Sequence, residues 1–233
     1  MTISVIIPAL NEEKYLPQTF ASVKKMNRQP DEIIVVNAQS EDKTAEIATS
    51  FGAKIVSVDR RSIGYSRQKG LEAATGDIVA FTDADTILPS NWLSTIAGFI
   101  ENDQVVGVFG GFRVPDGPWW YRLYINGVQP FTNTLTYAIF KIPIATGQNM
   151  AFIRKNALSA GGFPEDFKIA EDIEIARRVM STGPIVFSQQ FYVVASGRRG
   201  YEGFWQLISR NFSAFFYYFI YRKADKIGFP NIR

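Results

Sequence analysis

The chain has 233 residues, of which 46% are hydrophobic and 20% charged, so a disordered chain is excluded and one α/β domain with a sizeable core is favoured. It contains no cysteine and no histidine, which excludes disulfides, thiolate or imidazole metal ligands and a catalytic imidazole. Acid-base chemistry therefore falls mainly to Asp, Glu, Lys or Tyr, and a bound metal needs oxygen ligands, which favours Mg²⁺, Mn²⁺ or Ca²⁺.

Strand and helix patterns alternate along the first part of the chain. Apolar, β-branched runs predict buried parallel strands at 3–7, 32–36, 54–58 and 77–81. Helical spacing predicts helices at 11–26, 40–50 and 64–74, the first opening at Asn11 and the second capped by Asp42, while Pro8 is expected to stop the first strand. This order predicts a doubly wound, mostly parallel sheet that binds ligands at the carboxyl ends of its strands.

Two carboxylates follow the fourth predicted strand directly. Asp83 and Asp85 lie two positions apart, so in an extended chain both point to the same side. Their repulsion is relieved if a hard divalent cation joins them and bridges to a diphosphate. The alternative is a solvated turn that also caps the next helix.

A second acidic pair, Glu171 and Asp172, opens the helix predicted for 172–181. In a chain without histidine, a carboxylate there is a candidate general base that deprotonates an acceptor hydroxyl. Acidic residues are also favoured at a helix N-terminus by the macrodipole alone, so both interpretations stand.

Several segments, taken in order, resemble glycosyltransferase family 2, whose members have the GT-A fold. They are residues 5–13, 34–44, 76–85, 147–152 and 161–165, the last followed by the acidic pair 171–172. The resemblance covers residues 3 to 200. It implies a Rossmann-like, mostly parallel sheet flanked by helices, and an enzyme that moves a sugar from a nucleotide-diphosphate donor to an acceptor, usually with inversion and with Mg²⁺ or Mn²⁺ as cofactor.

The resemblance also implies a role for individual residues. In the nucleotide-sugar site it places four residues at the nucleoside: Pro8, Ala9, Asn11 and Glu12. Arg67 and Lys69 match two positions that are basic in the family, and Asp83 and Ala84 lie near the ribose. It makes Asp85 the metal ligand and Asp172 the catalytic base, with Glu171 beside it. The competing interpretations are that Pro8 only ends a strand, Glu12 only favours a helix start, and Arg67 and Lys69 only solvate a helix.

The chain departs from the family pattern in two places. Asn37 stands where members often carry Asp near the pyrimidine base, which leaves the preferred base open. The Gln-x-x-Arg-Trp motif of processive members is absent, and residues 196–200 take its place, so transfer of a single sugar is expected. Arg198 and Arg199 either clamp the diphosphate or an anionic acceptor, or are ordinary surface cations.

Residues 113–145 and the tail are rich in aromatic side chains. We expect a GT-A domain at 1–200, with a nucleotide-sugar half at 1–112 and an acceptor and catalytic-base half at 113–200, and a basic, aromatic, amphipathic helical tail at 201–233. The middle aromatics either contact an acceptor or pack in the core. The tail either binds a membrane surface, which suits a polyprenyl-phosphate-type acceptor over a glycan, or packs on the domain or a dimer partner.

The expected location is cytoplasmic, or peripheral on the cytoplasmic membrane face. The first residues do not resemble a signal peptide, and the uncharged run 211–221 is too short to span a bilayer. A catalytically inactive, membrane-associated nucleotide-binding adaptor is the alternative function. Nucleic-acid binding is not expected, because the net positive charge comes from the tail: residues 198–233 hold seven basic and two acidic residues.

Overall fold

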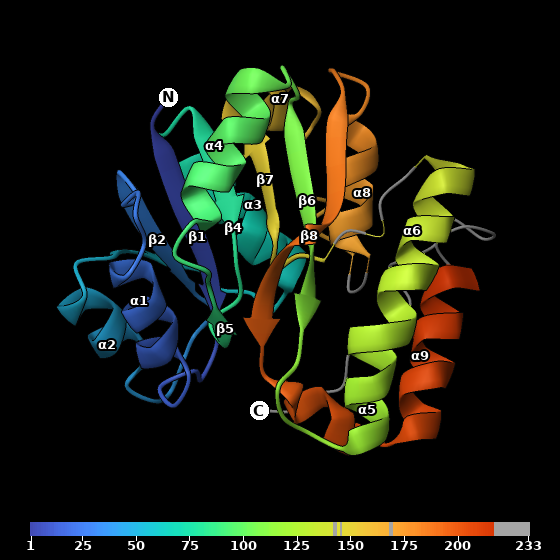
Figure 1. Cartoon of the computed structure of the whole chain (residues 1–233). Helices are drawn as coiled ribbons and strands as arrows, with labels where there is room; N and C mark the ends of the chain where they lie inside the picture. Colours follow the sequence, from blue (N-terminus) through green and yellow to red (C-terminus); the bar gives the residue numbers. More distant parts are fainter. Residues whose placement is uncertain (142–143, 145, 168–169, 217–233) are drawn as a thin grey trace.

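The computed structural model describes residues 1–141, 144, 146–167 and 170–216, and within them the chain folds around one eight-stranded sheet (Figure 1). The strand order is β3-β2-β1-β4-β7-β6-β8-β5. The strands are β1 (Ile3–Ala9), β2 (Glu32–Asn37), β3 (Lys54–Ser57), β4 (Ile78–Phe81), β5 (Thr86–Ile87), β6 (Gly107–Arg113), β7 (Met150–Ile153) and β8 (Ile185–Ala195).

Helices lie on both faces and at one end of the sheet (Figure 1). They are α1 (Leu16–Lys24), α2 (Thr44–Ser50), α3 (Ile63–Ala73), α4 (Trp92–Asn102), α5 (Trp119–Leu123), the π-helical η1 (Tyr124–Val128), α6 (Gln129–Phe140), α7 (Arg154–Ser159), α8 (Glu171–Val179), the 3₁₀ turn η2 (Gly197–Glu202) and α9 (Phe204–Phe216). In the described part of the chain, none is long and apolar enough to cross a bilayer.

The four strands predicted in the first part of the chain are confirmed. β1 pairs in parallel with β2 and β4, and β2 pairs in parallel with β3. The helices α1, α2 and α3 connect these strands in order. The other half makes the sheet mixed, because β7 runs antiparallel to both β4 and β6, while β6 and β8 are parallel. The carboxyl ends of β1, β2 and β4 still meet at one edge, as the doubly wound pattern predicts.

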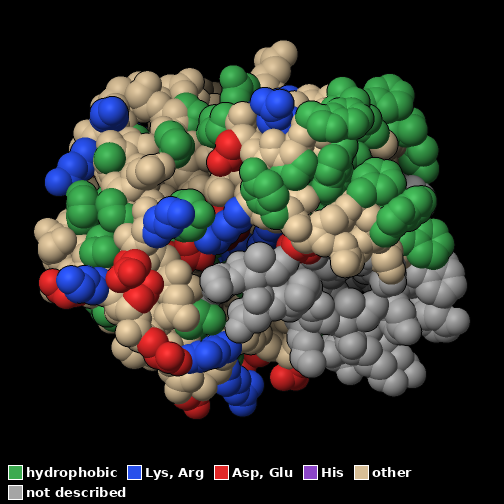
Figure 2. Space-filling view, turned by 90° about the horizontal axis from the view of Figure 1, so that it is seen from below, with side chains coloured by type: hydrophobic (Ala, Val, Ile, Leu, Met, Phe, Trp, Pro, Cys, Tyr) green, Lys and Arg blue, Asp and Glu red, His purple; other side chains and the backbone are tan. Residues whose placement is uncertain are grey.

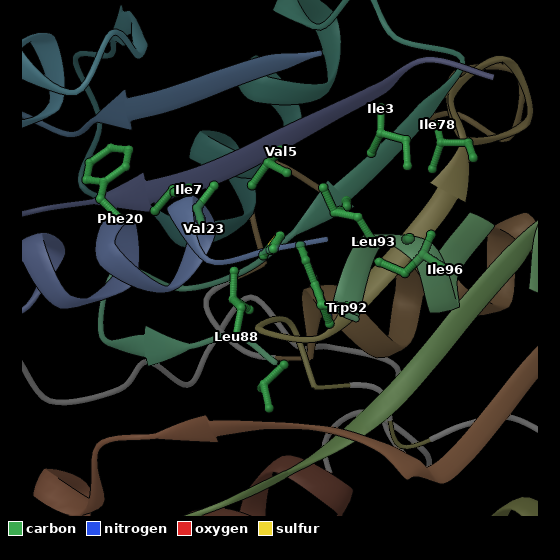
Figure 3. Close-up of a cluster of buried hydrophobic side chains, with 14 of the residues drawn as sticks. Ile3, Val5, Ile7, Phe20, Val23, Ile78, Leu88, Trp92, Leu93 and Ile96 are labelled. Carbon is green, nitrogen blue, oxygen red and sulfur yellow. The ribbon is translucent and has the colours of Figure 1, made fainter. Parts of the chain in front are cut away.

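Alternating side chains of the sheet enter two separate cores. On one face, Ile3, Val5 and Ile7 of β1 pack with residues of α1 and α4, including Phe20 and Trp92 (Figure 3). On the other face, Ile6 of β1 packs with residues of α3, α7 and α8. A strand that is apolar on both faces is what a sheet covered by helices on both sides requires, and it makes the edge rigid.

Two predicted boundaries at the end of β1 are wrong. Pro8 does not stop the strand, which continues through it to Ala9. Pairing with β4 ends at Ile6, so only the β2 edge of Pro8 is paired. The first helix begins at Leu16 and not at Asn11, which has a φ of +55° and belongs to the preceding loop. The N-cap of α2 is Lys43 and not Asp42; Asp42 lies one residue earlier and accepts a 2.9 Å hydrogen bond from the N–H of Thr44, the first residue of the helix.

The aromatic middle and the start of the tail form a helical layer beside β6 and β8. The elements α5, η1 and α6 follow one another as a column, and α9 lies next to it (Figure 1). Tyr121, Ile125 and Leu207 pack together with Val114 in a third, smaller core. The predicted helical tail is thus helical over Phe204–Phe216, and its remainder, 217–233, lies outside the described residues.

Candidate functional site

A buried arginine joins three elements at the carboxyl edge of the sheet. Arg67 projects from α3 and is only 3% exposed. It donates a 2.9 Å hydrogen bond to Asp83, which follows β4, and a second to Glu171 at the start of α8. A buried guanidinium needs such partners, because an unpaired charge in the interior is costly. Arg67, Asp83 and Glu171, all predicted site residues, are therefore one cluster.

Gly147 makes room for this arginine. A Cβ atom added at Gly147 would lie 2.1 Å from Nη2 of Arg67 and 2.2 Å from its Cζ, which is closer than atoms can approach. The backbone N–H of Gly147 also donates a 2.9 Å hydrogen bond to Oδ2 of Asp172. One glycine thus contacts the arginine and orients the neighbouring carboxylate. Only the family resemblance pointed to its segment; spacing alone did not single it out.

Asp172 lies beside this cluster as the second residue of α8. Its Oδ1 accepts a 2.9 Å hydrogen bond from the N–H of Ile173 and its Oδ2 accepts the one from Gly147. Burial, helped by the negative charge of Glu171, raises the pKa of Asp172 to about 7, although Arg67 and the two N–H donors act in the opposite direction. A carboxylate with a pKa near neutral pH is suited to take up and release a proton.

A second arginine lies across the edge, on η2. Arg198 donates two hydrogen bonds to the buried carboxylate of Glu12, at 2.7 and 3.1 Å, and lies 3.0 Å from Oδ2 of Asp85. Its guanidinium also lies over the ring of Tyr15, 4.7 Å from the centroid. Burial, with the negative charges of Asp83 and Glu12, raises the pKa of Asp85 to about 6, against the opposing effects of Arg198 and Arg199.

The two aspartates of the Asp-x-Asp pair therefore face different cations. Asp83 pairs with Arg67 and Asp85 with Arg198, whereas extended geometry predicted that both carboxylates point to the same side. The chain turns at Ala84 and Asp85 instead of staying extended. Ala84 is buried, and its carbonyl accepts a 2.7 Å hydrogen bond from the hydroxyl of Thr19, which fixes this turn.

The donor set at Asp85 suits Mg²⁺ or Mn²⁺. Its carboxylate is a hard oxygen ligand, and it lies at the carboxyl edge of the sheet beside the cavity lined by Tyr15 and Asp116. Among the described residues, no three acidic side chains gather closely enough to hold an ion by themselves. That fits a cation held by one or two carboxylates together with the phosphate oxygens of a ligand, which is a common way for proteins to bind Mg²⁺.

The predicted nucleoside loop lies at the ends of β1 and β2. The amide oxygen of Asn11 accepts a hydrogen bond from the N–H of Glu41, and that of Asn37 accepts one from the N–H of Ser40, at 2.9 and 3.0 Å. The carbonyl of Ala9 accepts the N–H of Ala38. These contacts, with the neighbouring Pro8, build a fixed polar rim around the ends of both strands.

One predicted residue is directed away from this group. Lys69 contacts Glu72 at 2.9 Å and Glu165 at 3.5 Å, and its ammonium lies over the ring of Tyr65. Two residues that the sequence did not single out are Asp116, whose carboxylate accepts the N–H of Gly197 at 2.6 Å, and Asn149. The buried side chain of Asn149 bonds to Trp92 and to the carbonyls of Gly111 and Phe191.

Figure 2 looks onto the edge where these strands end, and shows acidic and basic side chains around a hollow near the middle of the face. A cavity of about 140 Å³ adjoins Asp85 and is lined by residues of α1, of the loop after β6 and of the end of β8, among them Tyr15, Asp116 and Ser196. The arrangement offers a polar rim, a buried carboxylate with a raised pKa and two arginines, and so could bind an anionic ligand and move a proton.

The sequence of the chain is similar to those of known proteins. The family model described as "Glycosyl transferase family 2" matches residues 4–159. A glucosyl-dolichyl phosphate glucuronosyltransferase of Haloferax volcanii is 31% identical over 123 residues, which are 50% of this chain and 39% of that protein. A glucosyl-3-phosphoglycerate synthase of Mycolicibacterium smegmatis is 38% identical over 125 residues, 49% of this chain and 41% of that protein.

The fold of the chain is also similar to the folds of solved structures. The mannosyltransferase PcManGT from Pyrobaculum calidifontis, in complex with GDP-Man and Mn²⁺, superposes with a TM-score of 0.67 at 24% identity, covering 83% of this chain and 56% of that one. The architecture is therefore the GT-A fold. The chain spans about two fifths of the length of the two curated relatives named above.

Proposed function

The chain belongs to glycosyltransferase family 2, and from this we propose that it transfers a single sugar from a nucleotide-diphosphate donor to an acceptor nucleophile, with inversion and with Mg²⁺ or Mn²⁺. One observation carries the proposal: Asp172, with its pKa raised to about 7, lies at the carboxyl edge of the sheet beside the Arg67, Asp83 and Glu171 cluster. A base and an anion-binding edge are what direct displacement of a diphosphate needs.

We assign the donor to the rim formed by the ends of β1, β2 and β4. The nucleoside would lie against Pro8, Ala9, Asn11 and Asn37, with Asp83 and Ala84 at the ribose. This placement is supported by the backbone contacts that fix Asn11 and Asn37 at the rim. Lys69 is left out of the donor site, because it is directed toward Glu72 and Glu165 and away from the rim.

Arg198 and Arg199 would bind the diphosphate. Their place on η2, next to the end of β8 and within reach of Asp85, supports this assignment. Glu12 then acts through Arg198, which it holds by two hydrogen bonds, and does not itself contact the nucleoside. A guanidinium whose orientation is fixed in advance loses less entropy when it binds a phosphate.

In the reaction, the acceptor oxygen attacks the anomeric carbon while the bond from that carbon to the diphosphate breaks. Asp172 takes the proton of the acceptor hydroxyl, and the nucleoside diphosphate leaves with the bonding electrons. The N–H groups of Gly147 and Ile173 hold the carboxylate in place for this transfer. Asp85 would hold the divalent cation, which would supply positive charge to the departing diphosphate. If the acceptor is a phosphate, already ionised, Asp172 orients it instead.

The names of the similar proteins suggest donors and acceptors to test. PcManGT was solved with GDP-Man and Mn²⁺. The two relatives are named for a glucosyl-dolichyl phosphate and for glucosyl-3-phosphoglycerate. We propose that this chain uses either a polyprenyl-phosphate-type or a glycan acceptor, and that phosphate-bearing acceptors should be tried first.

Calorimetric titration with UDP, GDP, dTDP, ADP and CDP, with and without Mn²⁺, tests the donor site in the wild type and in Asp85→Ala. We expect one nucleotide to bind selectively, with affinity that depends on both Mn²⁺ and Asp85. Failure of folded wild-type protein to bind any of them would overturn the proposal.

Turnover is tested separately, by following release of the selected nucleoside diphosphate from its sugar donor in the presence of candidate acceptors. Metal-dependent nucleotide binding with no release of product under any condition would instead support the inactive adaptor. Glu46→Gln on α2, an exposed carboxylate away from the site, is the matched control for both assays.

A further inference from the structure

The helical layer beside the site turns apolar side chains outward. Eight large apolar residues of α5, η1, α6 and α9 are 47 to 78% exposed: Trp119, Leu123, Val128, Phe131, Leu135, Ile139, Trp205 and Phe212. We call this set the apolar platform. Figure 2 shows hydrophobic side chains gathered in one region of the face, on the side of the molecule where these helices lie. Exposed apolar surface that is contiguous, and not scattered, marks an interaction site.

The outer side of α6 is more apolar than that of a helix that faces water. On α6, Phe131, Leu135 and Ile139 recur every fourth residue and therefore share one exposed face, whereas Asn133 is only 5% exposed. A helix in water buries its apolar side and exposes its polar side. The outward side here suits an apolar medium.

The platform is fixed to the body of the protein. Its inner side contributes Tyr121 and Ile125 to the third core. The rings of Trp120 and Phe204 join α5 to α9, with centroids 5.4 Å apart, and Tyr137 packs against Phe187 of β8 at 5.5 Å. The exposed side chains are therefore presented by an anchored surface.

In the sequence, the charged residues within the platform elements are all basic, and Asp116 and Glu202 flank these elements. Residues 119–141 and 204–216 contain three basic residues, Arg122, Lys141 and Arg210, and no Asp or Glu. Arg122 and Lys141 are exposed. Basic residues beside apolar and tryptophan side chains match the anionic headgroups and upper acyl region of a phospholipid surface. We propose that the apolar platform docks on the surface of a membrane that contains anionic phospholipid.

The platform adjoins the edge of the site. Arg198 lies on η2, which leads directly into α9. Gly200 of η2 lies so close to α5 that an added Cβ would come within 2.8 Å of Pro118 Cδ and of the Tyr121 ring. Docking would therefore bring the carboxyl edge of the sheet near the lipid headgroups. The membrane surface itself is the partner proposed, and its binding requires no turnover.

Vesicle flotation of the full chain tests the proposal. With vesicles of equal parts phosphatidylglycerol and phosphatidylcholine, we expect the wild type to float, and with phosphatidylcholine alone to float far less. Phe131→Glu combined with Ile139→Glu should lower the bound fraction by about tenfold or more, since two apolar anchors become anions that face anionic lipid. The matched control, Ala21→Glu with Thr49→Glu, adds the same charge at exposed positions of α1 and α2 and should bind as the wild type does.

Three outcomes would overturn the proposal. One is wild-type protein that stays with the lipid-free fraction, and another is an equal loss of binding in the control. The third is a wild type that binds no vesicles but forms a dimer in analytical ultracentrifugation, and whose dimer is converted to monomer by Phe131→Glu combined with Ile139→Glu. The platform would then be an interface between copies of the chain. Circular dichroism establishes that each variant is folded. Nucleotide titration of the same variants shows whether the donor site is intact, so that a loss of vesicle binding can be told apart from damage to the donor site.

Discussion

The carboxylate of Glu12 accepts two hydrogen bonds from the guanidinium of Arg198, at 2.7 and 3.1 Å, across 186 positions of the chain. Glu12 lies in the loop after β1, and Arg198 lies on η2 after β8. The side chain of Glu12 is only 4% exposed and that of Arg198 24% exposed. This ion pair therefore ties the two ends of the described fold together at the edge where the donor is proposed to bind.

Replacing Glu12 by Gln should destabilise the protein. Losing one partner of a buried pair leaves the other charge uncompensated, but Arg198 keeps Asp85 at 3.0 Å, so we expect the free energy of unfolding to fall by about 2 kcal/mol. Urea denaturation measures this change. The control is Glu41→Gln, which removes the exposed partner of Arg61 and should cost less than about 1 kcal/mol. Equal effects of the two substitutions would contradict the structural role of Glu12.

The first four strands and the carboxyl edge were predictable because local patterns determine them. Runs of β-branched residues, such as 3–7, form buried strands, and the placement of Asp83 directly after β4 puts it at the edge whatever the rest of the fold does. The pairing of each carboxylate was not predictable. It depends on the turn at Ala84 and Asp85 and on Arg198, whose distance from Asp85 in the sequence leaves no local signal.

The platform shows a different limit of sequence reasoning. The aromatic residues of 113–145 were expected either to contact an acceptor or to pack in the core, and the structure divides them. Tyr121 is buried, whereas Trp119 and Phe131 are exposed at about 70%. The aromatic content was readable from the sequence, but the buried side of α6 was not, because polar Asn133 lies on that side.

Gly147→Ala should disrupt the arginine cluster. The new Cβ would lie within 2.3 Å of three atoms of the Arg67 guanidinium, so Arg67 must leave Asp83, Glu171 or both. We expect a lower melting temperature and at least a tenfold loss of sugar transfer, since the N–H of residue 147 also holds Asp172. Gly98→Ala on α4, where the nearest atom is 3.8 Å away, is the control and should be neutral or stabilising. Wild-type activity and stability in Gly147→Ala would show that the edge tolerates displacement of Arg67.

Metal-dependent nucleotide binding should depend on pH near 6. The pKa of Asp85 is raised to about 6, so below that pH the carboxyl is protonated, and a cation must displace the proton to bind. Affinity for the nucleotide and Mn²⁺ should therefore rise as pH increases through 6 and level off above it. Calorimetry near pH 6 in buffers of different ionisation enthalpy measures the proton released. No such release is expected from Asp85→Ala, and release of the same size from both proteins would rule out Asp85 as its source.

Asp172→Asn tests the proposed base by activity and by stability together. General-base catalysis contributes about 10²- to 10⁴-fold to a rate, so transfer to a hydroxyl acceptor should fall by that order, with nucleotide affinity unchanged. In the wild type, only ionised Asp172 accepts a proton. The rate should therefore fall as pH drops through about 7, the raised pKa of this carboxyl.

The same substitution, which should lower activity, should raise the stability of the fold at high pH. Because burial raises the pKa of Asp172 in the folded state above its ordinary value, the ionised form destabilises the fold; this cost is full above about pH 7 and shrinks as pH falls from 7 toward the ordinary carboxyl pKa. Asp172→Asn removes the cost, so its melting temperature should exceed that of the wild type at pH 8.5 and approach it at pH 5. Lower stability of the variant at every pH, with activity intact, would make Asp172 a structural helix-start residue and not the base. Lost activity with raised stability at high pH is the combination that a strained, functional carboxylate requires.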